Sequence, residues 1–327
     1  MADYLYSSAR VRALENRLVG RERIALLTDE DGAAGVWNRL AEYGIEPVRD
    51  ADGAILREES LLSLLERVYG EVREMLPDDR AVLLWLYPYD CNNIKAAIKA
   101  SVRGIDPHSM MFSFGTVEPE AVIDMVRTGV YEGLPSHMAE AAAQAVSDYA
   151  KTGNPQAVDL CLDRACYADM LQASGGEPFC NGLVKTKIDM TNLLSLIRVL
   201  RMRSGDAGEA LLMDAWIGGG VLSTDFLREQ YRLGEESLWA ALRSTEYARF
   251  AHGLGTSSAQ SEIERRADGC LMDKLYEVKY AAYGAEVVTA YLLAAEYEVR
   301  NLRIILAGKE TGLSPNTIRE RIRDGYV

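Results

Sequence analysis

Residues 296–309 read EYEVRNLRIILAGK, and this stretch decides the fold. It places an acid at Glu298 and an asparagine three residues later, at Asn301. Aliphatic residues follow at Leu302, Ile305 and Leu306. These offsets from the acid fall on one face of an α-helix. The stretch therefore predicts a helix in which a polar turn precedes an apolar stripe.

The same pattern occurs twice more upstream. Asp90 is followed by Asn93, and Asp189 is followed by Asn192, each with aliphatic residues or alanine at the matching later positions. The acids thus stand at positions 90, 189 and 298. This period is too long for a short solenoid repeat. It indicates three similar helical units, each built around one acid–asparagine helix.

A second recurring pattern marks helix starts. Each copy begins with a hydrophobic residue, continues with a polar or proline-containing cap, and ends with a second hydrophobic residue. This is the pattern of a hydrophobic staple. Copies stand at 117–122, 222–227 and 313–318, with a weaker copy at 19–24. Four helix starts thus alternate with three acid–asparagine helices, which indicates a tandem of three units circularly offset by one helix. We place the units at 1–110, 111–212 and 213–327 of one continuous body, with approximate boundaries.

Composition favours an all-α fold. Only 9 of the 327 residues are proline, while leucine, alanine, glutamate and arginine are abundant, and these are good helix formers. The apolar run at 81–87 could form a buried strand or a buried helical turn. We predict a helix, because Pro88 directly precedes the Asp90 helix and no partner strand is visible.

Charge and cysteine content limit the classes of function. The net charge is −13, from 36 basic and 49 acidic residues, which argues against nucleic acid or anionic lipid as the main partner. It fits docking onto a basic protein surface. No run of 18 apolar residues and no signal-peptide pattern occurs, so we expect a cytoplasmic chain without a membrane span. Five scattered cysteines indicate reduced thiols rather than a zinc site: Cys91, Cys161, Cys166, Cys180 and Cys270.

The chain offers little catalytic chemistry, so we predict no catalytic residue and no cofactor. The segment at 307–311 contains Gly-Lys but lacks the leading glycine of a phosphate loop. The triplet 218–220 has no dinucleotide-binding continuation, and Asp78-Asp79 lacks the third acid of a prenyl-diphosphate site. The three histidines are widely separated, at His108, His137 and His252.

The three acids allow two interpretations. If the units pack around a common axis, Asp90, Asp189 and Glu298 could converge and bind a metal. Alternatively, each acid lies early in its helix and complements the helix dipole, while the asparagine bonds to a neighbouring turn. We prefer the structural interpretation, because each motif repeats with its own unit, whereas a catalytic site would tend to break the symmetry.

The motifs resemble those of a known family. The segments that carry the resemblance are Tyr4 with Ala9–Glu15, then Asp90–Lys95, Asp189–Leu193 and Glu298–Lys309. Together they are similar to the C subunit of archaeal and bacterial V/A-type ATPases, which is related to the d subunit of the eukaryotic vacuolar ATPase. The resemblance covers the chain from Tyr4 to Val327, and its C-terminal motif is the most specific part.

The resemblance implies an all-helical, funnel-shaped protein of three similar units about a pseudo-threefold axis. It implies a non-catalytic central-stalk subunit that links the membrane proteolipid ring to the central axle, at the cytoplasmic face of the membrane. It assigns no partner-contact residues and leaves proton or sodium transport open. One departure is Leu194, which stands where the other copies carry Lys95 and Arg303, so that position is doubtful as a shared contact.

Three functions remain to be compared: a rotor adaptor, an all-α enzyme with a carboxylate–metal site where the units meet, and a helical scaffold for other partners. Metal analysis of the purified protein would separate the second from the others. Co-purification with an axle subunit and a proteolipid ring would separate the first from the third.

Overall fold

A computed structural model describes residues 4–76, 80–202 and 205–327. Within these ranges the chain is helical and forms no β-sheet; a single antiparallel bridge joins Arg49 and Ile55. The all-α prediction is therefore confirmed. The apolar run at 81–87 is helical as expected, because it passes through α5 and a 3₁₀ turn into α6. Asp78 and Asp79 lie outside the described residues.

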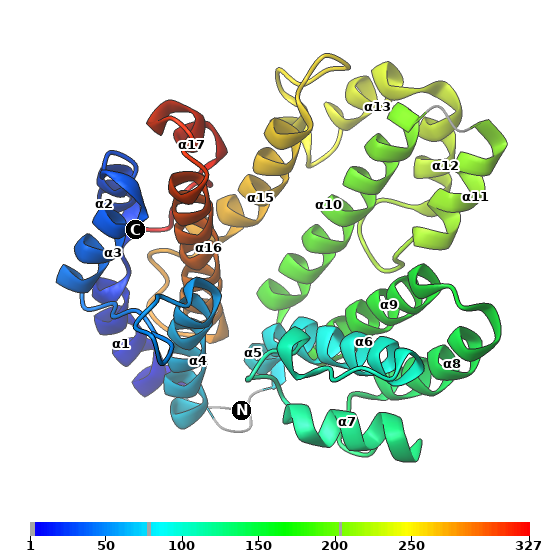
Figure 1. Ribbon diagram of the computed structural model, residues 1–327. Coiled ribbons are helices and arrows are strands. Elements are labelled where there is room, and N and C mark those ends of the chain that lie inside the picture. The colour runs from blue at the N-terminus through cyan, green and yellow to red at the C-terminus, as the bar shows by residue number, and fades with distance from the viewer. Residues whose placement is uncertain (1–3, 77–79, 203–204) are drawn as a thin grey trace. The chain divides into compact units, whose positions relative to one another are not determined.

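The helices form two compact bodies (Figure 1). The first body contains the two ends of the chain, residues 4–76 and 257–327. Its elements are α1 (Tyr4–Leu14), η1 (Glu15–Arg17), α2 (Gly20–Leu27), α3 (Gly32–Glu42), α4 (Arg57–Met75), α15 (Gln260–Glu277), α16 (Ala285–Glu310) and α17 (Pro315–Arg321).

The second body contains residues 80–256. Its elements are α5 (Arg80–Leu83), η2 (Leu84–Leu86), α6 (Tyr87–Arg103), η3 (His108–Met110), α7 (Pro119–Thr128), α8 (Ser136–Thr152), α9 (Pro155–Ala173), α10 (Pro178–Met202), α11 (Gly205–Ala215), α12 (Thr224–Leu233), α13 (Glu235–Leu242) and α14 (Ala248–Ala251). Helices α8 and α9 form a hairpin, and α6 packs against it and against α7.

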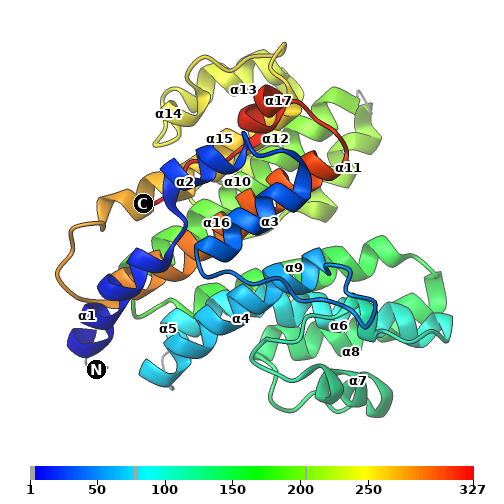
Figure 2. The ribbon, with the colours of Figure 1, turned by 60° about the vertical axis from the view of Figure 1, so that its left-hand side comes forward.

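Helix α16 is the centre of the first body. Its N-terminal half reads AEVVTAYLLAAEYEV, and nearly every residue from Ala285 to Ala295 is buried. A helix that is apolar on all sides must be covered on all sides. Helices α1, α2, α3, α4 and α17 pack on it, and Figure 2 shows α1 to α3 following its length.

The predicted helix starts are confirmed. Helices α7 and α17 begin at Pro119 and Pro315, and α12 begins directly after Ser223. Ser223 caps α12 by accepting a hydrogen bond from the N–H of Phe226 at 3.1 Å. At every start the second staple residue is buried: Val122, Leu227, Ile318 and, in α2, Ile24. Local capping and apolar burial therefore set these ends, as the sequence indicates.

The expected position of the acids within their helices is correct for only one copy. Asp90 lies in the first turn of α6. Asp189 and Glu298 lie deep inside α10 and α16, which begin at Pro178 and Ala285 rather than close to the motif. The influence of the helix dipole fades within the first turn. The dipole explanation is therefore wrong for Asp189 and Glu298, and other contacts must hold them.

Candidate functional site: three acid–asparagine clamps

Each asparagine of the repeated motif binds one distant residue through that residue's backbone. Asn93 donates from Nδ2 to the carbonyl of Phe112 at 3.1 Å and accepts from its N–H at 2.8 Å. Asn192 binds Ile217 in the same way, at 2.8 and 3.1 Å, and Asn301 binds Arg323 at 3.1 and 2.8 Å. All three asparagines are buried. We call each pairing an asparagine clamp.

The acids bind backbone N–H groups just before a helix. Asp90 accepts from the N–H of Thr116 at 2.8 Å, from that of Val117 at 3.2 Å and from the Thr116 hydroxyl at 2.6 Å, ahead of α7. Asp189 accepts from the N–H of Val221 at 2.8 Å and of Leu222 at 3.2 Å, ahead of α12. Each carboxylate thereby fixes where the following helix enters the fold.

Tyr247 adds a further donor to the second copy. Its hydroxyl donates to Asp189 Oδ2 at 2.6 Å, and both residues are buried. Burial raises the pKa of Asp189 above the ordinary value, although the hydroxyl and the two backbone N–H groups oppose that rise. The carboxylate is therefore held by hydrogen bonds rather than by a cation.

The third copy joins the two ends of the chain. Glu298 accepts hydrogen bonds from the N–H of Val19 and, at 3.2 Å, of Gly20, where α2 begins. The helix bound by the third acid is therefore α2 and not α17, which follows α16 in sequence. This is the arrangement that a circular offset by one helix requires, and the weak staple at 19–24 was its signal.

Two glycines allow the backbone to approach the carboxylates. A Cβ on Gly115 would lie 2.3 Å from Asp90 Oδ1, and one on Gly220 would lie 2.0 Å from Asp189 Oδ1. Any side chain at these positions would displace the carboxylate or the loop. Within the Gly218–Gly220 triplet, Gly220 thus has a packing role in the loop before α12, which the sequence alone did not reveal.

We expect Gly220→Ala to destabilise the chain by about 1–3 kcal/mol, because overpacking a fixed contact has that cost. Gly218→Ala is the matched control, since a Cβ there meets nothing within 4 Å. Urea unfolding of both variants, followed by circular dichroism, measures the difference. Equal midpoints for the two variants would show that the close approach does not constrain residue 220.

The carboxylate–metal interpretation finds no structural support. Among the residues that the structure describes, no group of three histidine, cysteine, aspartate or glutamate side chains could hold a metal ion. The acids of the motif instead accept hydrogen bonds from backbone N–H groups. Their arrangement serves packing and capping, which needs no metal.

The fifth residue after the motif acid makes different contacts in the three copies. Lys95 pairs with Asp163 on α9 at 2.6 Å, and Arg303 pairs with Glu58 on α4 at 2.7 Å. Leu194, in the second copy, is half-buried. The two cations therefore link their helix to a neighbour within the same body.

Sequence reasoning missed one further capping carboxylate. Asp169, which is buried in α9, accepts from the N–H groups of His137 and Met138 at 3.0 and 2.8 Å, at the start of α8. The His137 ring lies 2.7 Å from the same carboxylate. Nothing in the sequence around Asp169 signals this role, because its partners are backbone groups.

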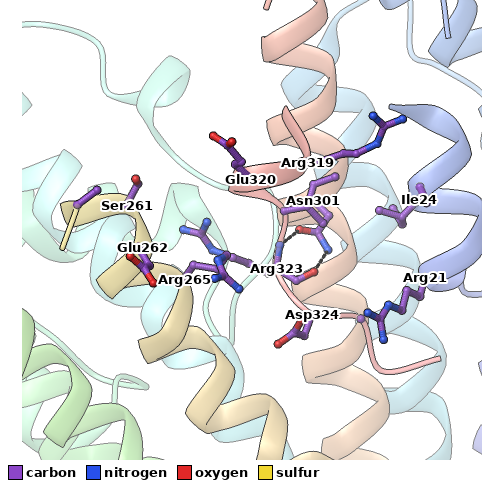
Figure 3. A pocket seen from close by; sticks show the side chains of 14 residues that line it. Arg21, Ile24, Ser261, Glu262, Arg265, Asn301, Arg319, Glu320, Arg323 and Asp324 are labelled. Atoms are coloured by element: carbon purple, nitrogen blue, oxygen red, sulfur yellow. Dashed lines mark hydrogen bonds between the residues drawn. The ribbon is translucent and has the colours of Figure 1, made fainter. Parts of the chain in front are cut away.

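A cavity of about 610 Å³ lies beside the third asparagine clamp, between α2, α15 and the segment after α17. In Figure 3 the Asn301–Arg323 clamp borders it, with Arg21 and Arg265 on either side. Arg323 is paired with Asp268 at 2.8 Å. The lining of the cavity also includes Glu262, Arg319, Glu320 and Asp324.

The charges of this cavity nearly balance. Arg319 is paired with Asp29, and Glu262 with Arg266. Among the described residues this leaves two lining cations and two lining acids without an ion pair: Arg21, Arg265, Glu320 and Asp324. The cavity therefore does not select an anion or a cation.

Comparison with known proteins identifies the family. The model of the ATP synthase (C/AC39) subunit matches residues 7–321. The chain belongs to this family.

Three relatives illustrate the match, and each is the C subunit of a rotary ATPase. That of the A-type ATP synthase of Methanocaldococcus jannaschii is 23% identical over an alignment that covers 98% of this chain and 86% of the relative. That of the V-type sodium ATPase of Enterococcus hirae is 23% identical, with 97% of each chain covered. That of the A-type ATP synthase of Haloferax volcanii is 24% identical, covering 97% of this chain and 96% of the relative.

Membership of the C subunit family confirms the resemblance seen in the sequence. The family is that of a structural subunit of the rotary ATPase and not of its catalytic subunit. Across the described part of the chain, no helix is both long enough and apolar enough to cross a membrane.

Proposed function

We propose that this protein links the membrane proteolipid ring of a V/A-type rotary ATPase to the central axle and transmits torque between them. The observation that carries the proposal is the family match, which extends over nearly the whole chain. The relatives are named as subunits of A-type ATP synthases and of a V-type sodium ATPase. The same role here would couple ATP turnover to proton or sodium transport.

We further propose that three similar units, near 1–110, 111–212 and 213–327, surround a pseudo-threefold axis. The support is that each unit contributes one acid–asparagine helix with the same two-part bonding. The asparagine clamps a loop residue, and the acid holds the start of a helix. A part that transmits torque must resist deformation. Buried hydrogen bonds between distant segments provide that stiffness.

The test is reconstitution. The purified chain is mixed with the axle subunits and with the proteolipid ring, at low and high salt, and complex formation and ATP-driven ion pumping are measured. We expect the chain to bind both partners and to restore coupling between ATP hydrolysis and pumping. Fully coupled pumping without the chain would rule out the adaptor role.

We expect at least one of these contacts to weaken as salt rises. The chain carries a net charge of −13, and an acidic surface facing a basic one speeds docking and sets register. Salt screens such contacts beyond about 8 Å at physiological ionic strength. Association constants at two salt concentrations measure the effect. Binding that ignores salt would show that docking is mainly apolar.

A further inference from the structure

Two of the five cysteines lie on helices that pack against each other in the second body. Cys91 stands near the start of α6, directly after Asp90, and Cys166 stands in the middle of α9. Their exposed fractions are only 2% and 4%, and both are free thiols. Neither thiol takes part in the acid–asparagine clamps.

Ion pairs between α6 and α9 show how the two helices are aligned. The pairs are Lys95 with Asp163 and Lys99 with Asp159. A step of four residues forward along α6 thus matches a step of four residues back along α9, so the helices are antiparallel. One step back from the first pair reaches Cys91 on α6 and residue 167 on α9, which directly follows Cys166. The alignment therefore brings the two cysteines opposite each other.

A direct contact places the Cys91 sulfur on the turn that carries Cys166. The thiol of Cys91 donates to the carbonyl of Leu162 at 3.5 Å, and Leu162 lies one turn before Cys166 on the same helix. The Cβ of a helical residue is tilted towards the N-terminus of its helix, so the Cys166 side chain leans over the turn that begins at Leu162. The two thiols therefore meet, and a hydrogen bond joins them.

The surroundings keep Cys166 in the thiol form in the folded chain. The hydrogen bond from Cys91 and burial raise the pKa of Cys166, and Lys187 on α10 only partly opposes the rise. A thiol is a weaker nucleophile than a thiolate. Burial also excludes bulky oxidants, so an oxidant that reaches the sulfur atoms during local opening of the helices has to be small and uncharged.

We propose that Cys91 and Cys166 are a modification site, at which a peroxide produces a reversible disulfide that locks α6 to α9. Hydrogen peroxide oxidises one thiol to a sulfenic acid and is itself reduced to water. The second thiol attacks the sulfenic sulfur, and the S–O bond breaks as the S–S bond forms. The oxygen then leaves as a second water molecule. Two thiols and one peroxide thus give one disulfide and two water molecules, and a dithiol reductant reverses the change. This site is independent of the role proposed above for the whole chain.

The disulfide joins the helices close to two capping carboxylates. Asp90 precedes Cys91 and holds the start of α7, and Asp169, three residues after Cys166, holds the start of α8. A bond between the two cysteines closes a long loop and so restricts the unfolded chain. We therefore expect oxidation to raise the midpoint of thermal unfolding by about 5 °C or more.

Peptide mapping tests the proposal on the full wild-type chain. The folded chain is treated with hydrogen peroxide, remaining thiols are blocked by alkylation, and tryptic peptides are identified by mass spectrometry without reduction. We expect residues 81–95 to be joined to residues 165–185 with the loss of two hydrogen atoms, and to separate again with dithiothreitol. The second peptide also contains Cys180. Fragmentation of the linked peptides shows which of its two cysteines is joined, and Cys180→Ala should retain the link while Cys166→Ala should lose it.

Cys161→Ala is the matched control. Cys161 lies on the same helix, but it is half-buried and its thiol contacts the carbonyl of Ala141 on α8 at 4.0 Å. Its replacement should leave both the link and the rise in the unfolding midpoint unchanged, whereas Cys91→Ala should lose both.

Three results would overturn the proposal. The first is oxidation at Cys161 or Cys270 while Cys91 and Cys166 remain open to alkylation. The second is a link that forms in urea but not in the folded chain, which would mean that the native helices hold the sulfur atoms apart. The third is an unchanged unfolding midpoint in the linked chain, which would show that the disulfide does not lock α6 to α9.

Discussion

Asp189→Ala is expected to lower the free energy of unfolding by about 2–4 kcal/mol. The change leaves three donors without their acceptor: the N–H groups of Val221 and Leu222 and the hydroxyl of Tyr247. A buried donor left unsatisfied costs about 1–3 kcal/mol. The expected loss of stability is smaller than three times this cost, because Val221 is exposed and its N–H can reach water. Urea unfolding at pH 7 measures the loss.

Two further variants make this test specific. Asp214→Ala, at the exposed end of α11, should change stability by no more than about 0.5 kcal/mol. Tyr247→Phe should cost about 0.5–1.5 kcal/mol in the wild-type chain and almost nothing in the Asp189→Ala background. Additive losses in the double variant would mean that the hydroxyl and the carboxylate do not support each other.

The sequence was enough to predict which helices carry the motif. An acid and an asparagine three residues apart lie on one helix face, and their spacing repeats at Asp90, Asp189 and Glu298. The helix starts at Pro119 and Pro315 were equally visible, because proline and a staple mark them locally. Features that depend on neighbouring residues in the chain were therefore predictable.

The partners of the motif could not be predicted. The asparagines and acids bind backbone N–H and C=O groups, which every residue type except proline offers in full. Nothing in the sequence of Ile217 or Arg323 distinguishes it as a clamped residue. Glu298 and Val19 are joined by a hydrogen bond although they lie 279 residues apart in the sequence. Gly115 and Gly220 are required by the close approach to Asp90 and Asp189. A glycine in a sequence does not by itself indicate such a contact, because glycine has many other uses.

The true start of α16 was hidden for a different reason. Residues 285–295 are apolar on all sides, so they lack the period that an amphipathic helix shows. Because the helix begins so far upstream, Glu298 lies in its interior. The helix dipole then has little influence on Glu298. The N–H groups of Val19 and Gly20 donate hydrogen bonds to its carboxylate instead.

The second large effect is expected for Asn301→Ala, which should destabilise the chain by roughly 1–3 kcal/mol. The clamp satisfies both the N–H and the carbonyl of Arg323, and alanine satisfies neither. Asn301→Asp separates the two bonds, because one carboxylate oxygen can still accept from the N–H while the other faces the carbonyl. We therefore expect Asn301→Asp to lose stability as well, and to recover part of it at low pH as the carboxylate is protonated. Unfolding midpoints at pH 5 and pH 7 measure both effects.

The matched control for this clamp is Asn316→Ala. Asn316 is exposed on α17 and accepts only from the Arg319 side chain at 3.0 Å, so its loss should change stability by no more than about 0.5 kcal/mol. If the clamp is structural, Asn301→Ala should still support ion pumping in the reconstituted complex at temperatures where it stays folded. A variant as stable as the wild-type chain that nonetheless fails to couple rotation would instead make Asn301 a contact with a partner, since it also borders the 610 Å³ cavity. Stability and coupling measured on the same preparation therefore distinguish a residue that holds the protein together from one that transmits its torque.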